Sequence, residues 1–159
     1  MNNEQRIKTN KIAIDEDDVK LFFNNRVNKN LPYLINYTNY QDKHPELALE
    51  RDKYEKDRIM PFLNLQPESR VLDIGCGVGR WGNHMLKILS NQGMYVGADY
   101  SGNILNLAKN HFRENKNFYF CESSFQDILL NLPGNIKQNN FNVISVSYTH
   151  LRAHETLMN

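Results

Sequence analysis

The segment VLDIGCGVGR, residues 71–80, constrains the fold of this chain more than any other. A short apolar strand, expected over residues 70–74, contains Asp73 near its end. Gly75, Gly77 and Gly79 follow at alternate positions before a helix predicted from about residue 80 to 90. Glycines so placed are typical of a backbone that takes positive φ or approaches a ligand closely. At the carboxyl end of a first strand, such a turn lies where open α/β sheets bind ligands.

Further strands and helices alternate after this turn. Strands are predicted over 94–99, over 117–121 and from residue 141, and a short helix over 125–132 that Pro133-Gly134 ends. Between the second and third strands, Ser101 can cap a helix whose inward face holds four apolar residues, Ile104, Leu105, Ala108 and Phe112. The alternation predicts an α/β fold with a parallel sheet and right-handed crossovers.

The residues before the first strand form a different unit. Residues 1–14 are polar and without periodicity, and helices are predicted over 15–29, with Asp15 as the cap, and over 45–63. The loop between these helices contains Tyr33, Tyr37 and Tyr40, and for the last two a core position and a lid position are both open. We divide the chain into an arm with cap helices (1–66), a ligand-binding domain (67–145) and a tail (146–159).

Composition excludes several function classes. The 159 residues have a net charge of +1, which gives no field that would attract nucleic acid or an anionic membrane. Cys76 and Cys121 make neither a disulfide framework nor a metal-ligand set, so reduced thiols and no metal are expected. The first 20 residues have no apolar signal region, and no stretch has the length of a membrane span. We expect a cytoplasmic protein.

Two ligand classes use a glycine turn of this kind. The dinucleotide pattern G-x-G-x-x-G requires a glycine where this chain has Arg80. The observed pattern D-x-G-x-G-x-G instead resembles motif I of the class I S-adenosylmethionine (SAM) methyltransferases. MYVGAD (94–99), ESSFQDI (122–128) and FNVIS (141–145) resemble motifs II, III and the start of IV, the last two weakly.

The resemblance implies a set of cofactor residues. In that family the glycine turn, here Gly75, Gly77 and Gly79, surrounds SAM, and the acid at the position of Asp73 places the turn or the cofactor's ammonium. The Asp99 carboxylate would accept hydrogen bonds from both ribose hydroxyls. The side chain after it, Tyr100, would pack on the adenine. The remaining adenine contacts fall on Ser124, which stands where the family often has an acid, and on the backbone of Phe125.

The resemblance also implies a Rossmann-like fold: a mostly parallel sheet with helices on both faces, truncated here after the fourth strand, with the N-terminal helices as a cap. The expected function is methyl transfer from SAM to a small-molecule acceptor. The alternatives are an NAD-dependent oxidoreductase and a non-catalytic SAM-binding module. No catalytic residue is named, because the base in this family normally comes from the fourth strand or later, and the oligomeric state is left open.

Several reactive side chains have simpler interpretations. Cys76 is interpreted as a spacer in the turn, and His84 and His111 as surface residues. Trp81 is interpreted as a packing residue, with a place in the wall of the cofactor site as the alternative. Arg80 is interpreted as a surface residue, with a contact to the SAM carboxylate as the alternative.

The tail resembles a cloning artefact. The run VSYTHLRAHET (146–156) matches a translation of the transposase adapter that is ligated to DNA in library preparation. We therefore expect the native sequence to end near Ser145 and exclude His150 and His154 as bases or ligands. The fourth strand would then be an exposed edge.

Overall fold

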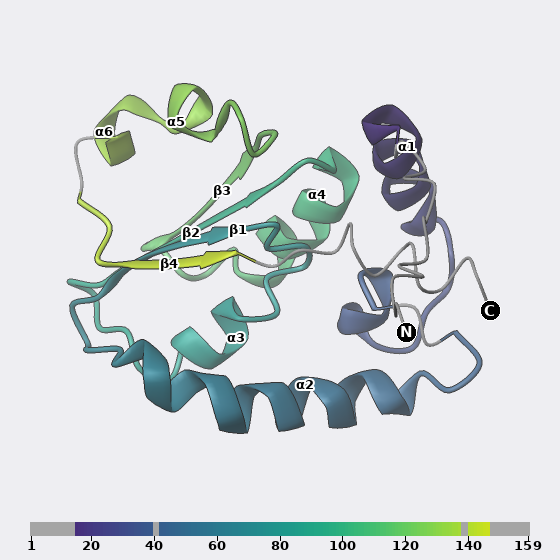
Figure 1. Cartoon of the computed structure of the whole chain (residues 1–159), viewed down its shortest axis with the longest axis horizontal. Coiled ribbons are helices and arrows are strands. Elements are labelled where there is room, and N and C mark those ends of the chain that lie inside the picture. The colour runs from purple at the N-terminus through teal and green to yellow at the C-terminus, as the bar shows by residue number, and fades with distance from the viewer. Residues whose placement is uncertain (1–14, 40–41, 138–139, 147–159) are drawn as a thin grey trace, which may run out of the picture.

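The computed structural model describes residues 15–39, 42–137 and 140–146, and four parallel strands form its centre (Figure 1). They are β1 (Arg70–Ile74), β2 (Met94–Asp99), β3 (Phe118–Glu122) and β4 (Val143–Val146), in the order β3-β2-β1-β4. β1 pairs in parallel with both β2 and β4. The predicted parallel sheet is confirmed, and the fourth strand lies beside the first.

Helices cover both faces of the sheet. On one face η2 (Met60–Leu63), α3 (Gly82–Met85) and the end of α4 (Gly102–His111) enclose a core that contains Met60, Val71, Trp81, Met85, Tyr95, Phe112 and Phe118. On the other face α5 (Ile128–Asn131) and α6 (Gly134–Lys137) cover Leu72, Val96 and Ala98. Trp81 is a core residue, as the sequence predicted.

The helix predicted over 80–90 is wrong in extent. Regular helix is limited to α3, and the flanking hydrogen bonds alternate between i−4, as from Leu89 N to Met85 O, and i−3, as from Ile88 N to Met85 O. Gly82, a poor helix former, lies where a Cβ would be 3.1 Å from the Tyr95 ring. Where Gly82 packs closely against the sheet, the chain therefore forms a short α-helix flanked by i−3 hydrogen bonds instead of one long helix.

Three other predicted helices are also shorter than expected. The helix predicted over 15–29 is α1 (Glu16–Arg26). The helix predicted over 45–63 is α2 (Glu46–Ile59), which the 3₁₀ turn η2 follows directly. Pro61 in η2 has no N–H group to donate an α-helical hydrogen bond. The helix predicted over 125–132 is only α5, and α6, which the sequence analysis missed, follows Pro133.

The N-terminal segment divides between two places. α1 (Glu16–Arg26) and η1 (Leu34–Tyr37) lie at the carboxyl ends of the strands, whereas α2 runs along one side of the molecule (Figure 1). α1 begins at Asp15, whose side chain accepts hydrogen bonds from the backbone of Asp17 and Asp18, as predicted. Phe23 of α1 packs with Val78 of the glycine turn and Ile104 of α4. The division into domains stays a prediction, and 1–14, Tyr40 and 147–159 lie outside the described residues.

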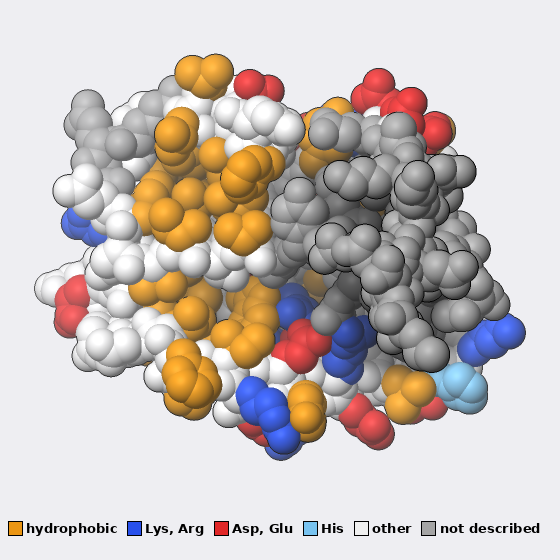
Figure 2. Space-filling view, viewed as in Figure 1, with side chains coloured by type: hydrophobic (Ala, Val, Ile, Leu, Met, Phe, Trp, Pro, Cys, Tyr) orange, Lys and Arg blue, Asp and Glu red, His pale blue; other side chains and the backbone are white. Residues whose placement is uncertain are grey.

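β4 forms an edge of the described sheet with an apolar outer surface. Ile144 and Val146 on β4, and Leu129 and Leu130 on α5, are at least half exposed. Figure 2 shows hydrophobic side chains gathered over the part of the molecule that holds α5, α6 and β4. Within the described part of the chain, β4 is therefore an edge strand, as the sequence predicted.

Candidate cofactor site

The glycine turn joins β1 to α3 at the carboxyl edge of the sheet. Gly75, Gly77 and Gly79 have φ values of 72°, 55° and 78°, which are unfavourable for any residue with a side chain. The backbone N–H groups of Gly75 and Cys76 both donate to the carbonyl oxygen of Ala98, at 2.8 and 3.0 Å. The requirement for glycine that the sequence indicated is thus confirmed by the backbone at all three positions.

Asp99 connects the glycine turn to the start of α4. Its Oδ2 accepts a hydrogen bond from Gly77 N at 2.8 Å, and its Oδ1 accepts one from Ser101 N at 3.0 Å. Ser101 in turn caps α4 by accepting from Ile104 N, as predicted. An ionised carboxylate has about four lone-pair directions, so Asp99 has the chemistry to accept ribose hydroxyls beside these backbone donors.

The three glycines differ in what surrounds them. A Cβ on Gly79 would overlap the ring of Phe112, so the small size of this residue serves packing of the turn against the end of α4. A Cβ on Gly77 would lie 2.6 Å from Cγ2 of Thr38, which follows η1. The N-terminal segment therefore touches the turn directly. The role of each glycine in binding a cofactor stays a prediction.

Asp73 is completely buried beneath the turn. Its Oδ2 accepts a hydrogen bond from Tyr95 Oη at 2.6 Å, whereas no described residue donates a hydrogen bond to its Oδ1. Burial raises the pKa of Asp73 to about 6, although the hydroxyls of Tyr95 and Ser145 and the charge of Arg80 favour the ionised form. A buried carboxyl oxygen without a hydrogen-bond donor is rare in a structural core, and groups with shifted pKa values cluster at functional sites.

Tyr100 lies against α1. The ammonium of Lys20 is 4.5 Å from the centre of the Tyr100 ring, and Tyr100 Oη donates to Asp17 Oδ1 at 3.3 Å. Lys20 also forms a salt bridge of 2.8 Å with Glu122 at the end of β3. Asn24 adds a second connection, because its Oδ1 accepts a hydrogen bond of 2.7 Å from Ser101 Oγ. α1 thus spans the ends of β2 and β3, where the resemblance places the adenine.

Ser124 and Phe125 follow β3. The hydroxyl of Ser124 donates to Asp127 Oδ2 at 2.9 Å and accepts from Asp127 N at 3.1 Å, so it caps the turn that leads into α5. The Phe125 side chain is 61% exposed. The structure therefore gives Ser124 a local capping role, and the adenine contacts of both residues stay predictions.

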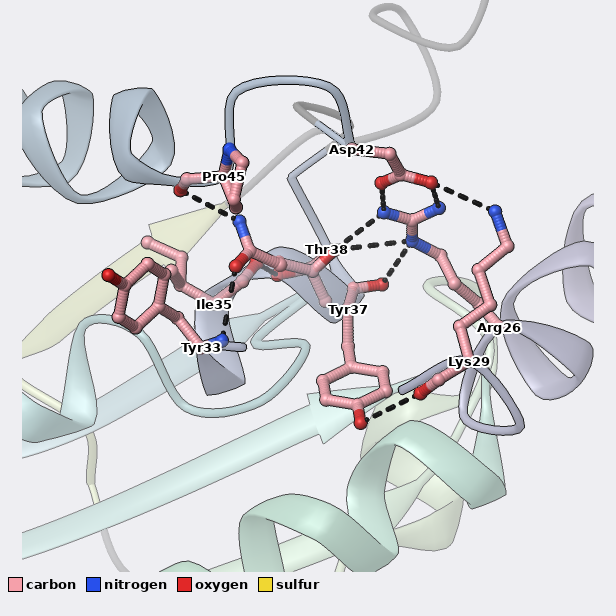
Figure 3. Close-up of polar contacts among 9 residues, drawn as sticks. Arg26, Lys29, Tyr33, Ile35, Tyr37, Thr38, Asp42 and Pro45 are labelled. Carbon is pink, nitrogen blue, oxygen red and sulfur yellow. Dashed lines mark hydrogen bonds and ion pairs between the residues drawn. The ribbon is translucent and has the colours of Figure 1, made fainter. Parts of the chain in front are cut away.

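A buried arginine binds the end of η1, next to Thr38 (Figure 3). Arg26, which is 2% exposed, donates to the carbonyl oxygens of Asn36 and Tyr37 and forms a two-point ion pair with Asp42. The hydrogen bonds from Arg26 to Asp42, with a second ion pair from Lys29 to Asp42, lower the pKa of Asp42 to about 2. Arg26 is therefore the anchor of the segment that reaches Gly77.

Arg80 is not the surface residue that the sequence predicted. Its side chain is 15% exposed, forms a 2.5 Å ion pair with Glu55 of α2 and lies 3.5 Å from Asp52. It thereby joins the glycine turn to α2. Cys76 stays interpreted as a spacer, since burial keeps its thiol neutral by raising its pKa, and both cysteines are free. His111 is exposed, as predicted, whereas His84 is partly buried.

Sequence reasoning missed Arg26, Thr38, Asn24 and Tyr95. Their partners lie far away along the chain, and the sequence offered no signal for them beyond their residue types. Within the described ranges, no group of three or more His, Cys, Asp and Glu side chains is arranged to hold a metal ion. None of the helices in the described part has the length and apolar character that crossing a bilayer requires.

Comparison with known proteins identifies the family. A family model described as a methyltransferase domain matches residues 65–157, more than half of the chain. The chain belongs to the methyltransferase-domain family. This agrees with the resemblance drawn from motifs I and II and favours methyl transfer over the oxidoreductase alternative. The match includes part of segment 146–159, whose attribution to adapter DNA stays a prediction.

Curated relatives of this methyltransferase domain include demethylmenaquinone methyltransferases. That of Staphylococcus saprophyticus is 24% identical over 102 residues, which are 64% of this chain and 41% of the relative. That of Oceanobacillus iheyensis is 29% identical over 73 residues, which are 46% of this chain and 31% of the relative. The chain therefore spans less than half the length of these relatives.

Solved methyltransferases share the fold. A Haemonchus contortus phosphoethanolamine N-methyltransferase, in complex with phosphoethanolamine and S-adenosylhomocysteine, superposes with a TM-score of 0.51 at 17% identity. The superposition covers 68% of this chain and 21% of that one. At this identity the similarity concerns the fold alone, and it confirms the predicted Rossmann-like fold.

Proposed function

We propose that this chain is the cofactor-binding part of a cytoplasmic SAM-dependent methyltransferase that acts on a small-molecule acceptor. The observation that carries the proposal is the convergence of a positive-φ glycine turn, the Asp99 carboxylate and the unsatisfied oxygen of Asp73 at one edge of the sheet. These are the groups that a ligand with a ribose diol and a cationic amino-acid end requires. SAM is the methyl donor of the class I family, and its sulfonium supplies an activated methyl group.

The residues of this chain would act mainly by binding and orienting. Asp99 would hold the ribose, the backbone of Gly75 and Gly77 would approach the amino-acid part, and Tyr100 would lie beside the adenine. Positioning of this kind supplies much of the rate of a displacement whose leaving group is already activated. Excluding water from the site adds to it.

A small acceptor fits the placement of α1 and η1. Both elements lie at the carboxyl edge, and α1 is tied to β3 through Lys20 and to the start of α4 through Asn24. A covered edge suits a small molecule better than a macromolecule. The names of the relatives, which refer to a demethylated menaquinone and to phosphoethanolamine, support the same class of acceptor without selecting one member.

Calorimetric titration with S-adenosylhomocysteine, the stable demethylated product, tests the binding site. Replacing Asp99 by alanine removes a charge-assisted acceptor, and we expect binding to weaken by about 1.5–3 kcal/mol. Asp57→Asn on the exposed side of α2 is the matched control and should leave affinity unchanged. Unchanged affinity in Asp99→Ala would remove Asp99 from the site.

A transfer assay separates an enzyme from a non-catalytic binding module. The product of the uninterrupted genomic reading frame would be incubated with SAM carrying a labelled methyl group and with quinone and phospho-amine acceptors. Label in an acceptor supports the proposal. Tight binding of SAM with no transfer to any small molecule would favour the binding module.

A further inference from the structure

Asp73 and Tyr95 form a buried pair at the centre of the fold. Both residues have no exposed surface, and they come from adjacent strands, β1 and β2. The Tyr95 ring stacks on Phe118 with a centroid distance of 5.0 Å, so the position of its hydroxyl is fixed by packing. That hydroxyl donates to one oxygen of Asp73 at 2.6 Å.

The two oxygens of Asp73 therefore have different environments. Oδ2 is held by Tyr95, whereas Oδ1 is buried and accepts no hydrogen bond from any described residue. Tyr95 keeps its proton, because burial and the adjacent carboxyl raise its pKa well above the usual value, so its hydroxyl is the donor in this hydrogen bond. The one unsatisfied acceptor of the pair is thus Oδ1 of Asp73, a residue two positions before the first glycine of the turn.

We propose that Tyr95 is a positioning residue for cofactor binding: it orients Asp73 and favours its ionised form, so that Oδ1 receives the cationic amino-acid end of the methyl donor. This inference rests on the proposed function, since it assigns the glycine turn to that ligand. Tyr95 itself lies in the core cluster and acts through Asp73.

The surroundings of Asp73 set how the pair responds to pH. From its own turn, the charge of Arg80 favours the carboxylate, and Cys76 is a neutral thiol. The hydroxyls of Tyr95 on β2 and Ser145 on β4 also favour the carboxylate. The negative charge of Asp99, at the end of β2, opposes ionisation of Asp73. Burial outweighs these effects and raises the pKa of Asp73 to about 6.

The sign of the pH dependence follows from this balance. A cationic ligand binds the ionised form of Asp73, so below pH 6 binding must first remove a proton and becomes weaker. Loss of the Tyr95 hydroxyl removes a hydrogen bond that favours the carboxylate, so the pKa of Asp73 rises further. Tyr95→Phe should therefore weaken binding at low pH and leave it nearly unchanged at pH 8.

The experiment is a titration of the 159-residue chain with S-adenosylhomocysteine between pH 5 and pH 8. Wild-type affinity should rise through about pH 6 and then level off. The Tyr95→Phe curve should be displaced upward by about one pH unit, which means binding about tenfold weaker near pH 5.5 and close to wild type at pH 8. Tyr119→Phe, the same change on β3 on the other face of the sheet, should follow the wild type.

Two further measurements do not depend on Tyr95→Phe alone. Asp73→Asn should abolish the dependence on pH around 6, and the carboxyl carbon of Asp73, followed by NMR, should titrate near pH 6 in the wild type. If Asp73→Asn keeps the wild-type pH profile, or if Tyr95→Phe weakens binding equally at every pH or not at all, the inference is overturned. In those cases a wild type that still binds, with loss in Asp99→Ala, preserves the proposed function. A wild type that binds at no pH overturns both.

Discussion

The contact between Gly77 and Thr38 gives the sharpest test of how the N-terminal segment fits the glycine turn. In Gly77→Ala the new Cβ would stand 2.6 Å from Cγ2 of Thr38, at a backbone φ of 55°. The left-handed conformation costs alanine roughly 1–2 kcal/mol, and overpacking adds about 1–3 kcal/mol. We expect a total loss of about 2–5 kcal/mol in the free energy of unfolding.

Thr38→Ser separates the two contributions. It removes Cγ2 and keeps the hydroxyl that donates to the carbonyl oxygen of Ile35. The other atoms of Thr38 would be at least 3.4 Å from the new Cβ, which is ordinary contact. Combining Gly77→Ala with Thr38→Ser should therefore recover the overpacking cost and leave the backbone cost. The favourable coupling energy should therefore equal the overpacking cost, about 1–3 kcal/mol.

Urea unfolding of the wild type, both single variants and the double variant measures this coupling. Gly134→Ala on α6 is the control, because no atom lies within 4 Å of its prospective Cβ and its φ is not positive. It should be neutral or slightly stabilising. A coupling energy below about 0.3–0.5 kcal/mol, the limit expected for independent sites, would show that Thr38 does not press on the turn.

Other contacts give shorter tests. Arg26→Met removes the donor to the carbonyl oxygens of Asn36 and Tyr37 and leaves Asp42 with its ion pair to Lys29. It should cost about 2–5 kcal/mol in thermal or urea unfolding, since each acceptor left unsatisfied costs about 1–3 kcal/mol. The exposed Arg51→Met should cost less than about 1 kcal/mol, and equal losses would contradict the anchoring role. Because the pKa of Asp42 is lowered to about 2, its stabilising contribution is present above pH 4 and is lost as the pH falls toward 2. Asp42→Asn should therefore flatten the acid limb of a plot of unfolding free energy against pH. An unchanged acid limb would refute this assignment. Ile144→Lys on the exposed face of β4 should reduce aggregation in light scattering and change stability by less than about 0.5 kcal/mol; undiminished aggregation would place the adhesive surface elsewhere.

Local sequence signals predicted the parts of the fold that depend on neighbouring residues. The bounds of β1 and β2 agree with the predicted strands, because apolar runs between turn residues determine them. The caps at Asp15 and Ser101 are also confirmed, since a cap forms with the next three residues. The positive φ values of the glycine turn were predictable from three glycines at alternate positions directly after a strand.

Contacts between distant residues were not predictable in this way. Tyr95 and Asp73 are 22 positions apart, and Arg80 and Glu55 are 25 apart. Nothing in the local pattern of either pair indicates that the fold brings them together. The predicted extent of the helix after the turn was wrong for the same reason. The close packing of Gly82 against Tyr95 is a tertiary contact, which the local sequence does not indicate.

The buried carboxyl of Asp73 is stabilising only at low pH. Its pKa is about 6 in the folded chain and 3.8 in the reference state, so its favourable contribution is complete below pH 3.8 and is lost as pH rises through 6. The loss is on the order of 3 kcal/mol at pH 7.5. Asp73→Asn carries no charge, so its unfolding free energy relative to the wild type should increase by up to that amount between pH 4 and pH 7.5. Parallel stability curves would mean that the carboxyl is not desolvated. Divergent curves, with cofactor binding weakened in Asp73→Asn, would show that this carboxylate serves binding at the expense of folding.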